Sequence, residues 1–290
     1  MIVTRLNGGL GNQMFQYAAG RRLALHNNTN LVIDISWFDG PGLHATAKRV
    51  YELDIFKVVG TISHDPVFHK PRTGILSALG LRQKDLRVYM QPDSGYVYSP
   101  EILDAEDYSR LEGYWQSEDY FQDVAEQIRK DFTFRKLPNQ PNKEMLNKIG
   151  ISNAVSLHVR RGDYAQDKNT NSFHGLAPLD YYGECMYRIE KDIDEPHFFI
   201  FSDEPEWCKK NLKNHKNMTY VDINDADHGA EDMRLMAACK HHIIANSSFS
   251  WWGAWLNPKR DKKVYAPKQW FAGTSVVDTR ELIPKDWIRL

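Results

Sequence analysis

Two arginines and an aspartate follow a short apolar run in the segment VSLHVRRGDYAQD, residues 155–167. Arg160 and Arg161 stand where this run gives way to a glycine. A guanidinium presents a planar fork of donors that matches phosphate oxygens, so the pair predicts an anion site. A surface ion pair with Asp163 would explain the same residues without a ligand. The position at a predicted strand end favours the ligand, because parallel sheets bind ligands at the carboxyl ends of their strands.

A second candidate for anion binding is the segment NSSFSWWGAWL, residues 246–256. Ser247 or Ser248 is placed to cap a helix whose first backbone N–H groups would attract an anion. The alternative is an ordinary capped helix in which Trp251, Trp252 and Trp255 belong to the core.

The glycine-rich segment NGGLGNQ, residues 7–13, has part of a dinucleotide-binding pattern. Met14 replaces the third glycine of that pattern, and no lysine follows as in a P-loop. We therefore expect a loop that lets a ligand approach the backbone closely, rather than a nucleotide fingerprint.

The elements that must position these residues alternate between strands and helices. The chain opens with a strand–helix–strand pattern, and five apolar runs follow residue 150: AVSLHV, HFFIFS, MTYVDI, HHIIANS and KKVYAP. Helical patterns lie between most of them, including residues 179–192 and 231–240. This alternation predicts an α/β protein with a parallel sheet covered by helices.

The domain organisation follows from an amphipathic segment and a polar linker. Residues 119–134 carry apolar side chains four apart and predict a helix. The polar residues 135–144 are the best linker candidate. We predict an N-terminal domain over residues 1–140 and a C-terminal domain over 141–290, with the last residues free to pack back on the first domain. The segment from about 40 to 100 gives no clear pattern.

Composition excludes several classes of protein. The formal charge is −1, so the overall field would not attract nucleic acid or anionic lipid. The three cysteines form no C-x-x-C pair, which is typical of a reducing compartment. No signal-peptide pattern and no run of eighteen apolar residues is present, so we expect a cytoplasmic protein without a transmembrane segment, able to act at the inner face of a membrane.

Five motifs together resemble those of one enzyme family: GGLGNQMFQYAAGRRLA, GYWQSEDYF, HVRRGDY, FSDE and ANSSFSWWGAWLN. In this order, and across nearly the whole chain, they are similar to the bacterial α-1,2-fucosyltransferases of glycosyltransferase family 11. The resemblance implies a glycosyltransferase B fold of two Rossmann-like domains facing across a cleft. It also implies GDP-β-L-fucose as donor, inversion at the fucose anomeric carbon, and no required metal or other cofactor.

The resemblance makes HVRRGDY the donor-binding motif, with His158, Arg160 and Arg161 near the pyrophosphate. Cations aimed there would stabilise the charge that builds on the departing diphosphate. Asp163 is then either an orienting partner of Arg160 or the base that accepts the proton of the acceptor hydroxyl. We take Arg160 and Asp163 as the catalytic pair.

The remaining site residues are expected around this motif. Asp203 and Asp222 would contact the guanine edge or the ribose, with a helix N-cap as the alternative for each. Asp232 would contact the base; its alternative is an acidic residue in a first helical turn, favoured by the helix dipole. The hydroxyls and backbone of Ser247, Ser248 and Ser250 would contact the phosphates. The full set of further donor contacts is Gly11, Asn12, Gln13, Asp203, Asp222, Asp232, Asn246, Ser247, Ser248, Phe249 and Ser250. Trp115 and Gln116 would contact the acceptor sugar, and Trp115 could equally belong to the core.

The acceptor implied by the resemblance is a terminal β-galactose whose 2-hydroxyl is attacked, on an oligosaccharide or a lipid-linked glycan precursor. Two rivals stay open. The D-x-D segments at 192–194 and 225–227 have the spacing of metal-dependent transferases that use another nucleotide sugar. A carbohydrate-binding module without catalysis would use the eight tryptophans as surface platforms.

Overall fold

The computed structural model describes residues 1–44, 49–64, 86–91, 96, 98–212, 217–225, 228–272 and 278–290, apart from the side chains at 43, 44, 163, 166 and 169. The chain divides into two compact units. The first comprises Met1–Arg135 and Arg280–Leu282, and the second Lys136–Thr279 and Ile283–Leu290.

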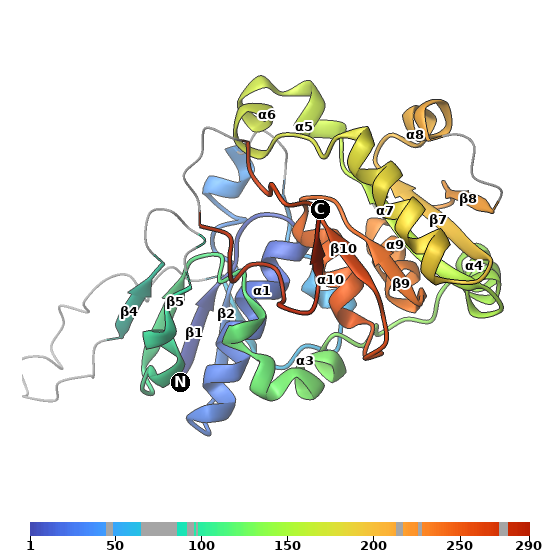
Figure 1. Cartoon of the computed structure of the whole chain (residues 1–290). Helices are drawn as coiled ribbons and strands as arrows, with labels where there is room; N and C mark the ends of the chain where they lie inside the picture. Colours follow the sequence, from blue (N-terminus) through green and yellow to red (C-terminus); the bar gives the residue numbers. More distant parts are fainter. Residues whose placement is uncertain are drawn as a thin grey trace, which may run out of the picture. The chain divides into compact units, whose positions relative to one another are not determined.

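The first unit is built on a parallel sheet with the strand order β3-β2-β1-β5-β4 (Figure 1). Its strands are β1 (Ile2–Arg5), β2 (Leu31–Asp34), β3 (Thr61–Ser63), β4 (Arg87–Met90) and β5 (Ser109–Glu112). Its helices are α1 (Leu10–His26) and α3 (Ala125–Asp131), with short 3-10 turns η1 (Pro41–His44), η2 (Leu53–Ile55), η4 (Pro100–Asp104), η5 (Glu118–Tyr120) and η6 (Gln122–Val124). The predicted strand–helix–strand opening is confirmed.

Helix α1 packs closely on β1 because of a glycine in its middle. A Cβ atom at Gly20 would lie 2.7 Å from the Cβ of Thr4, so no larger residue fits without movement. The Thr4 hydroxyl donates to the carbonyl of Gln16, which joins the strand to the same helix.

The second unit contains a six-stranded parallel sheet with the order β11-β10-β9-β6-β7-β8 (Figure 1). The strands are β6 (Asn153–Val159), β7 (Pro196–Ser202), β8 (Met218–Val221), β9 (His241–Ile243), β10 (Val264–Ala266) and β11 (Ile288–Arg289). The helices are α4 (Gln140–Gly150), α5 (Gly162–Gln166), α6 (Lys168–His174), α7 (Leu179–Asp192), α8 (Pro205–Asn211), α9 (Gly229–Ala238) and α10 (Ser248–Leu256). All five strands predicted after residue 150 are present. The α/β class with parallel sheets is therefore confirmed.

The central strand β6 is covered on both faces. Leu157 belongs to a core cluster that includes residues of α7, whereas Ala154 belongs to a second cluster with residues of α4 and α9. Because side chains of a strand alternate between faces, His158 shares the face of Ala154. Because both faces of β6 are buried, its sequence is a nearly continuous apolar run. His158 is only 6% exposed for the same reason.

Two sequence expectations about helices need correction. Residues 119–134 do not form one helix, because Phe121 has an extended φ of −149° between the turns η5 and η6, and only α3 is α-helical. The polar linker is also shorter than expected, since α4 begins inside it. Asn139 caps α4 by accepting a hydrogen bond from the N–H of Asn142, and Pro141 lies in its first turn.

Buried cores contain the tryptophans of α10 and the three cysteines of the second unit. Trp251, Trp252 and Trp255 are buried, and the ring centroid of Trp251 lies 5.4 Å from that of Trp287. The expectation that these α10 tryptophans belong to the core is confirmed. The three free cysteines, Cys185, Cys208 and Cys239, are also buried, and burial raises the pKa of each thiol, that of Cys208 to about 11. Within the described ranges, no helix has the length and apolarity needed to cross a membrane.

Candidate active site

The carboxyl ends of three neighbouring strands bring the predicted motifs together. Strand β6 pairs with β9 on one side and with β7 on the other, and all three run parallel. One edge of the sheet therefore carries all three segments that follow or end these strands: 158–161, 202–204 and 245–250. This is the edge at which open parallel sheets bind their ligands.

Two ion pairs join the end of β6 to the end of β7. Arg160 Nη1 lies 2.9 Å from Asp203 Oδ2, and Arg161 Nε lies 3.0 Å from Glu204 Oε2. The other oxygen of Asp203 accepts a hydrogen bond from the backbone N–H of Arg161 at 2.9 Å. All four side chains are between 21% and 26% exposed, so both guanidinium groups remain accessible to a ligand.

Aromatic rings support both arginines. The Cζ atom of Arg161 lies 4.0 Å from the ring centroid of Trp207 in α8, a distance typical of a cation–π contact. The Cζ atom of Arg160 lies 5.3 Å from the ring of Tyr164, which stacks on His174. Each guanidinium group is thus held by one carboxylate and one aromatic ring.

Gly162 is needed for the approach of Asp203. A Cβ atom at this position would lie 2.6 Å from Asp203 Oδ2 and 3.1 Å from its Cγ. Any larger residue would move the carboxylate that pairs with Arg160. The glycine of the RRGD segment therefore serves the ion pair.

His158 lies behind the arginines as a neutral imidazole. Burial, with a smaller contribution from the charge of Arg160, lowers its pKa to about 3. Its Nδ1 atom is buried without a hydrogen-bond partner among the described residues, and its ring lies 5.8 Å from that of Phe249 in α10. A buried ring nitrogen without a partner is costly, which suggests that a ligand can satisfy it.

The start of α10 completes this edge of the sheet. Ser247 is the N-cap, and its hydroxyl accepts a hydrogen bond from the N–H of Phe249 at 3.3 Å. The hydroxyl of Ser250 donates to the carbonyl of Ser247. Asn246 is 2% exposed, and its amide donates to the carbonyls of His174, Gly175 and Trp270. Asn246 thus positions the turn, while the helix N-terminus supplies partial positive charge.

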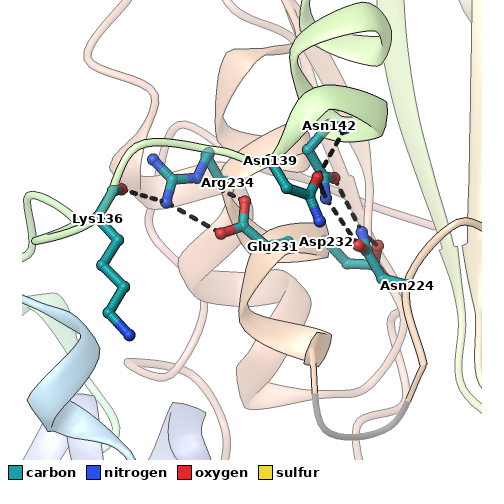
Figure 2. Close-up of polar contacts among 7 residues, drawn as sticks. All are labelled: Lys136, Asn139, Asn142, Asn224, Glu231, Asp232 and Arg234. Atoms are coloured by element: carbon teal, nitrogen blue, oxygen red, sulfur yellow. Dashed lines mark hydrogen bonds and ion pairs between the residues drawn. The ribbon is translucent and has the colours of Figure 1, made fainter.

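The predicted aspartates occupy different surroundings. Asp203 holds the arginines, whereas Asp222 forms an exposed ion pair with Lys209 at 2.9 Å. Asp232 lies in the first turn of α9 and accepts a hydrogen bond from Asn224 at 2.7 Å (Figure 2). The side chain of Asp163 lies outside the described part of the structure, so its two proposed roles stay predictions.

The first unit contains the other predicted residues. Gly11 is buried in the first turn of α1, and the carbonyl oxygen of Asn12's side chain accepts a hydrogen bond from the amide of Gln116 at 2.8 Å. Gln13 is fully buried: its amide donates to the carbonyls of Gly8 and Val50 and accepts from the N–H of Glu52. Gln13 therefore links the loop at residue 8 to the loop at residues 50–52 by hydrogen bonds.

Trp115 has two unusual features. It is 1% exposed and has a positive φ of 53°, a strained backbone for a residue with a large side chain. The amide oxygen of Gln91 accepts hydrogen bonds from the N–H groups of Tyr114 and Trp115, which holds this conformation. Trp115 therefore packs in the core of its unit beside Tyr120.

A buried Ser–His–Asn chain has the residue types of a nucleophilic triad but not its chemistry. His242 Nδ1 lies 2.8 Å from the hydroxyl of Ser156, and the amide nitrogen of Asn257 lies 2.9 Å from His242 Nε2. The amide donates, so Nε2 carries no hydrogen, and Nδ1 must donate to the serine. An imidazole that donates to a serine cannot also remove its proton, so this chain is structural.

The residues that carry the D-x-D patterns are partly described. Asp192 pairs with Lys263, and Asp225 accepts from the ring of His228. Asp227 lies outside the described residues. Among the residues that are described, no group of three or more His, Cys, Asp and Glu side chains is arranged to hold a metal ion.

The sequence reasoning missed the partners of the arginines. Glu204 and Trp207 hold Arg161. The signal for Glu204 was the FSDE motif, whose acidic residues stand at the end of the next strand of the sheet. The assembled edge can bind a diphosphate, because it offers two guanidinium forks beside a helix N-terminus.

Comparison with known proteins identifies the family. The profile of glycosyltransferase family 11 matches residues 105–290, a span that includes the arginine motif, the FSDE motif and the start of α10. The chain belongs to glycosyltransferase family 11. This member of the family is 34% identical to the α-1,2-colitosyltransferase of Escherichia coli over 100% of its own length and 99% of that relative.

Other relatives support the same assignment. The family 11 chain is 33% identical to the O-antigen biosynthesis glycosyltransferase WbnK of Escherichia coli, over 98% of this chain and 99% of that one. It is 26% identical to human galactoside α-(1,2)-fucosyltransferase 1, over 86% of this chain and 64% of the human protein. The fold is similar to that of NodZ α-1,6-fucosyltransferase co-crystallised with GDP, with a TM-score of 0.50, 15% identity, and coverage of 89% of this chain and 92% of that one. The chain is thus a glycosyltransferase with the expected type B fold.

Proposed function

We propose that this glycosyltransferase moves L-fucose from GDP-β-L-fucose to the 2-hydroxyl of a terminal β-galactose, with inversion, to form an α-1,2 linkage. The observation that carries the proposal is the edge of the second sheet, where Arg160 and Arg161 are held by Asp203 and Glu204 beside the start of α10. That edge fits a nucleoside diphosphate leaving group.

The reaction breaks the bond between the fucose anomeric carbon and the β-phosphate oxygen, and the electron pair stays on GDP. The acceptor oxygen attacks from the opposite face, which inverts the configuration, and its proton leaves to solvent or to a carboxylate such as Asp163. The arginines stabilise the charge that develops on the diphosphate, which is larger in the transition state than in the bound donor. Because a guanidinium has five N–H donors, Arg160 can keep its ion pair with Asp203 while it binds a phosphate oxygen, so it stays ordered throughout.

The acceptor is proposed to be a galactose-terminated oligosaccharide or a lipid-linked glycan precursor, assembled on the cytoplasmic side of a membrane. Relatives named for an O-antigen glycosyltransferase and for galactoside fucosyltransferases support this acceptor class. The first unit, in which Gln116 donates a hydrogen bond to Asn12 at the start of α1, is proposed as the acceptor side.

A second donor is favoured by the relative that is named for colitose. Colitose is the 3-deoxy analogue of L-fucose, so the two donors differ by one hydroxyl group. A site that hydrogen-bonds this hydroxyl rejects the deoxy sugar strongly, whereas a pocket that only fits the shape discriminates weakly. Competition between the two donors therefore distinguishes these functions.

The test is an assay of the purified enzyme with GDP-fucose or GDP-colitose and a panel of β-galactosides, with products identified by mass spectrometry. We expect a fucosylated product with an α-1,2 linkage. If only a colitosylated product forms, the donor is GDP-colitose and not GDP-fucose. If no product forms and no GDP binding is detected in a calorimeter, the proposal is overturned.

We also propose that catalysis needs no metal ion, because the two arginines and the helix N-terminus can neutralise the diphosphate. Turnover should survive treatment with EDTA. Complete loss in the chelator, restored by Mn²⁺, would contradict this part of the proposal.

A further inference from the structure

Three side chains from separate elements form a continuous chain of hydrogen bonds that ends at Asp232 (Figure 2). Asn142 comes from α4, Asn224 from the loop after β8, and Asp232 from the first turn of α9. The amides of Asn142 and Asn224 exchange hydrogen bonds of 2.8 and 3.0 Å. Asn224 Nδ2 then donates to Asp232 Oδ1 at 2.7 Å.

The arrangement fixes the orientation of both amides. Asn142 Nδ2 gives its two hydrogens to the side-chain oxygens of Asn139 and Asn224, at 2.8 Å each. Asn224 Nδ2 gives its two hydrogens to Asn142 and Asp232. If the Asn224 amide were flipped, its oxygen would face both the oxygen of Asn142 and the carboxylate. The reciprocal pair therefore keeps the donor of Asn224 pointed at Asp232.

Asp232 lies on the side of the sheet where His158 lies. Helix α9 packs against α10, and Phe249 of α10 packs against the core cluster that contains Leu235 and Met236 of α9. The His158 ring lies against the same Phe249. Asp232 Oδ1 is taken by Asn224, and among the described residues no donor contacts Oδ2, so this carboxylate can accept hydrogen bonds from a ligand.

The charge of Asp232 depends on its neighbours. Its pKa is raised to about 6: burial raises it most, the hydrogen bond from Asn224 lowers it, and the nearby Glu231 raises it. Glu231 is itself paired with Arg234, whose guanidinium also donates to the carbonyl of Lys136 (Figure 2). Asp225 and His228, near the start of α9, pair with each other on the surface. Asn224 is therefore the described group that favours the ionised carboxylate by direct contact.

We propose that Asn224 and, through it, Asn142 are positioning residues that orient and ionise Asp232 so that its carboxylate reads guanine. The inference rests on the proposed function, in which the donor carries GDP. Guanine presents two adjacent donors, N1–H and the 2-amino group, which match the two oxygens of one carboxylate. Hypoxanthine, the base of IDP, lacks the 2-amino group.

The test measures the affinities of GDP and IDP by calorimetry at pH 7.0 and pH 8.5. The proteins are the wild type, Asn224→Ala, Asn142→Ala, the double variant, and Asn147→Ala as a control. Asn147 is exposed on the same helix as Asn142. Melting temperatures identify any variant that does not fold.

At pH 7.0 the wild type should prefer GDP over IDP by about tenfold, the size expected for one hydrogen bond to a charged group. Asn224→Ala should weaken GDP binding by about tenfold and reduce the preference to less than about threefold, since the carboxylate loses its orientation and part of its charge. At pH 8.5 this variant should regain much of its GDP affinity, because Asp232 is then ionised. The control should match the wild type.

Asn142 acts only through Asn224, so the double variant should bind GDP as weakly as Asn224→Ala alone. A folded Asn224→Ala protein that keeps the wild-type preference for GDP over IDP would overturn the inference and leave the proposed function standing. Additive losses in the double variant would also contradict it. A wild type that fails to bind GDP at all would overturn the proposed function instead. If Asn142→Ala does not fold, Asn224→Ala alone decides the question.

Discussion

Arg160 and Asp203 form an ion pair that links the carboxyl ends of two neighbouring strands, with 2.9 Å between Nη1 and Oδ2. The same carboxylate accepts a hydrogen bond from the backbone of Arg161. One acidic residue thus sets the position of both arginines. Asp203 was expected to contact the nucleotide; that contact stays a prediction, and the structure adds its contacts with Arg160 and Arg161.

Replacement of Arg160 by lysine should slow turnover without unfolding the protein. Lysine keeps the charge but loses the planar fork, so it cannot hold Asp203 and a phosphate oxygen together. We expect a cost of about 2 to 4 kcal/mol in the barrier, as for removal of one preorganised donor. This corresponds to about a hundredfold or more in kcat, with a smaller loss of GDP affinity.

The matched control is Arg188→Lys, because Arg188 forms an exposed pair with Glu184 on α7. It should leave kcat unchanged. A folded Arg160→Lys enzyme within threefold of the wild-type kcat would show that Arg160 has a structural role alone.

Gly162→Ala should disrupt the ion pair between Arg160 and Asp203 and leave the rest of the fold intact. The added methyl group would lie 2.6 Å from Asp203 Oδ2 and would displace the carboxylate. We expect kcat to fall at least about tenfold, the effect of losing roughly 1.4 kcal/mol of transition-state stabilisation. Steady-state kinetics at saturating donor and acceptor would measure the change.

Gly183→Ala provides the comparison for a glycine that has no close neighbour. Gly183 is exposed within α7, and a Cβ atom there meets nothing within 4 Å. Alanine should stabilise the helix by about 0.5 to 1 kcal/mol without a change in kcat. Equal kinetic effects of the two substitutions would rule out a special role for Gly162.

Asn12 and Gln13 should behave differently although they are adjacent. Asn12→Ala removes a partner of Gln116 at the start of α1 and should lower kcat while GDP affinity stays nearly intact. Gln13→Ala removes three hydrogen bonds that hold the 8–9 and 50–52 loops, so it should lower the melting temperature. If Asn12→Ala abolished GDP binding, the glycine-rich loop would belong to the nucleotide site.

Acid should destabilise the second unit through its buried histidines. Burial lowers the pKa of His158 to about 3 and that of His242 well below its usual value. Below pH 6.5 the unfolded chain binds protons that the folded histidines do not, so stability is full above pH 6.5 and falls as the pH drops. From pH 7 to pH 5, each histidine should remove about 2 kcal/mol from the free energy of unfolding.

Asp232 has the opposite effect over the same pH range: it increases the free energy of unfolding as the pH falls, because its pKa is raised in the folded protein. Urea unfolding at pH 7 and pH 5 would measure the sum. In His242→Gln, which keeps an amide near Ser156 and Asn257, the loss between the two pH values should be smaller by the contribution of one histidine. An unchanged pH dependence in this variant would refute the assignment.

The sequence predicted the elements with strong periodicity. The apolar runs after residue 150 became β6 to β10, since a parallel strand covered on both faces consists of a short continuous apolar run. Helix α4 was missed although its signals were present, because Asn139 and Pro141 were read as linker residues and not as a cap and a first turn. The strands β3 and β4 are short edge strands with exposed residues, so they lack the pattern that reveals a buried strand.

The site was predictable in part for a related reason. His158 lies in the last residues of β6, Arg160 follows β6, and the serines of α10 follow β9, so their position at one edge of the sheet follows from topology alone. The pairing of Arg160 with Asp203 depends on which strand lies beside β6. The role of Asn224 depends on a loop that meets α4 and α9, and no spacing in the sequence shows that contact.

The distribution of the cysteines makes the second unit separately observable. All three of the chain's thiols, at Cys185, Cys208 and Cys239, belong to that unit, and the first unit contains none. Each thiol is buried with a raised pKa, so an alkylating reagent can react only when the surrounding structure opens. The rate of alkylation therefore measures how often the second unit opens. If GDP slows this rate, the nucleotide binds to the second unit, and no engineered probe is needed to show it.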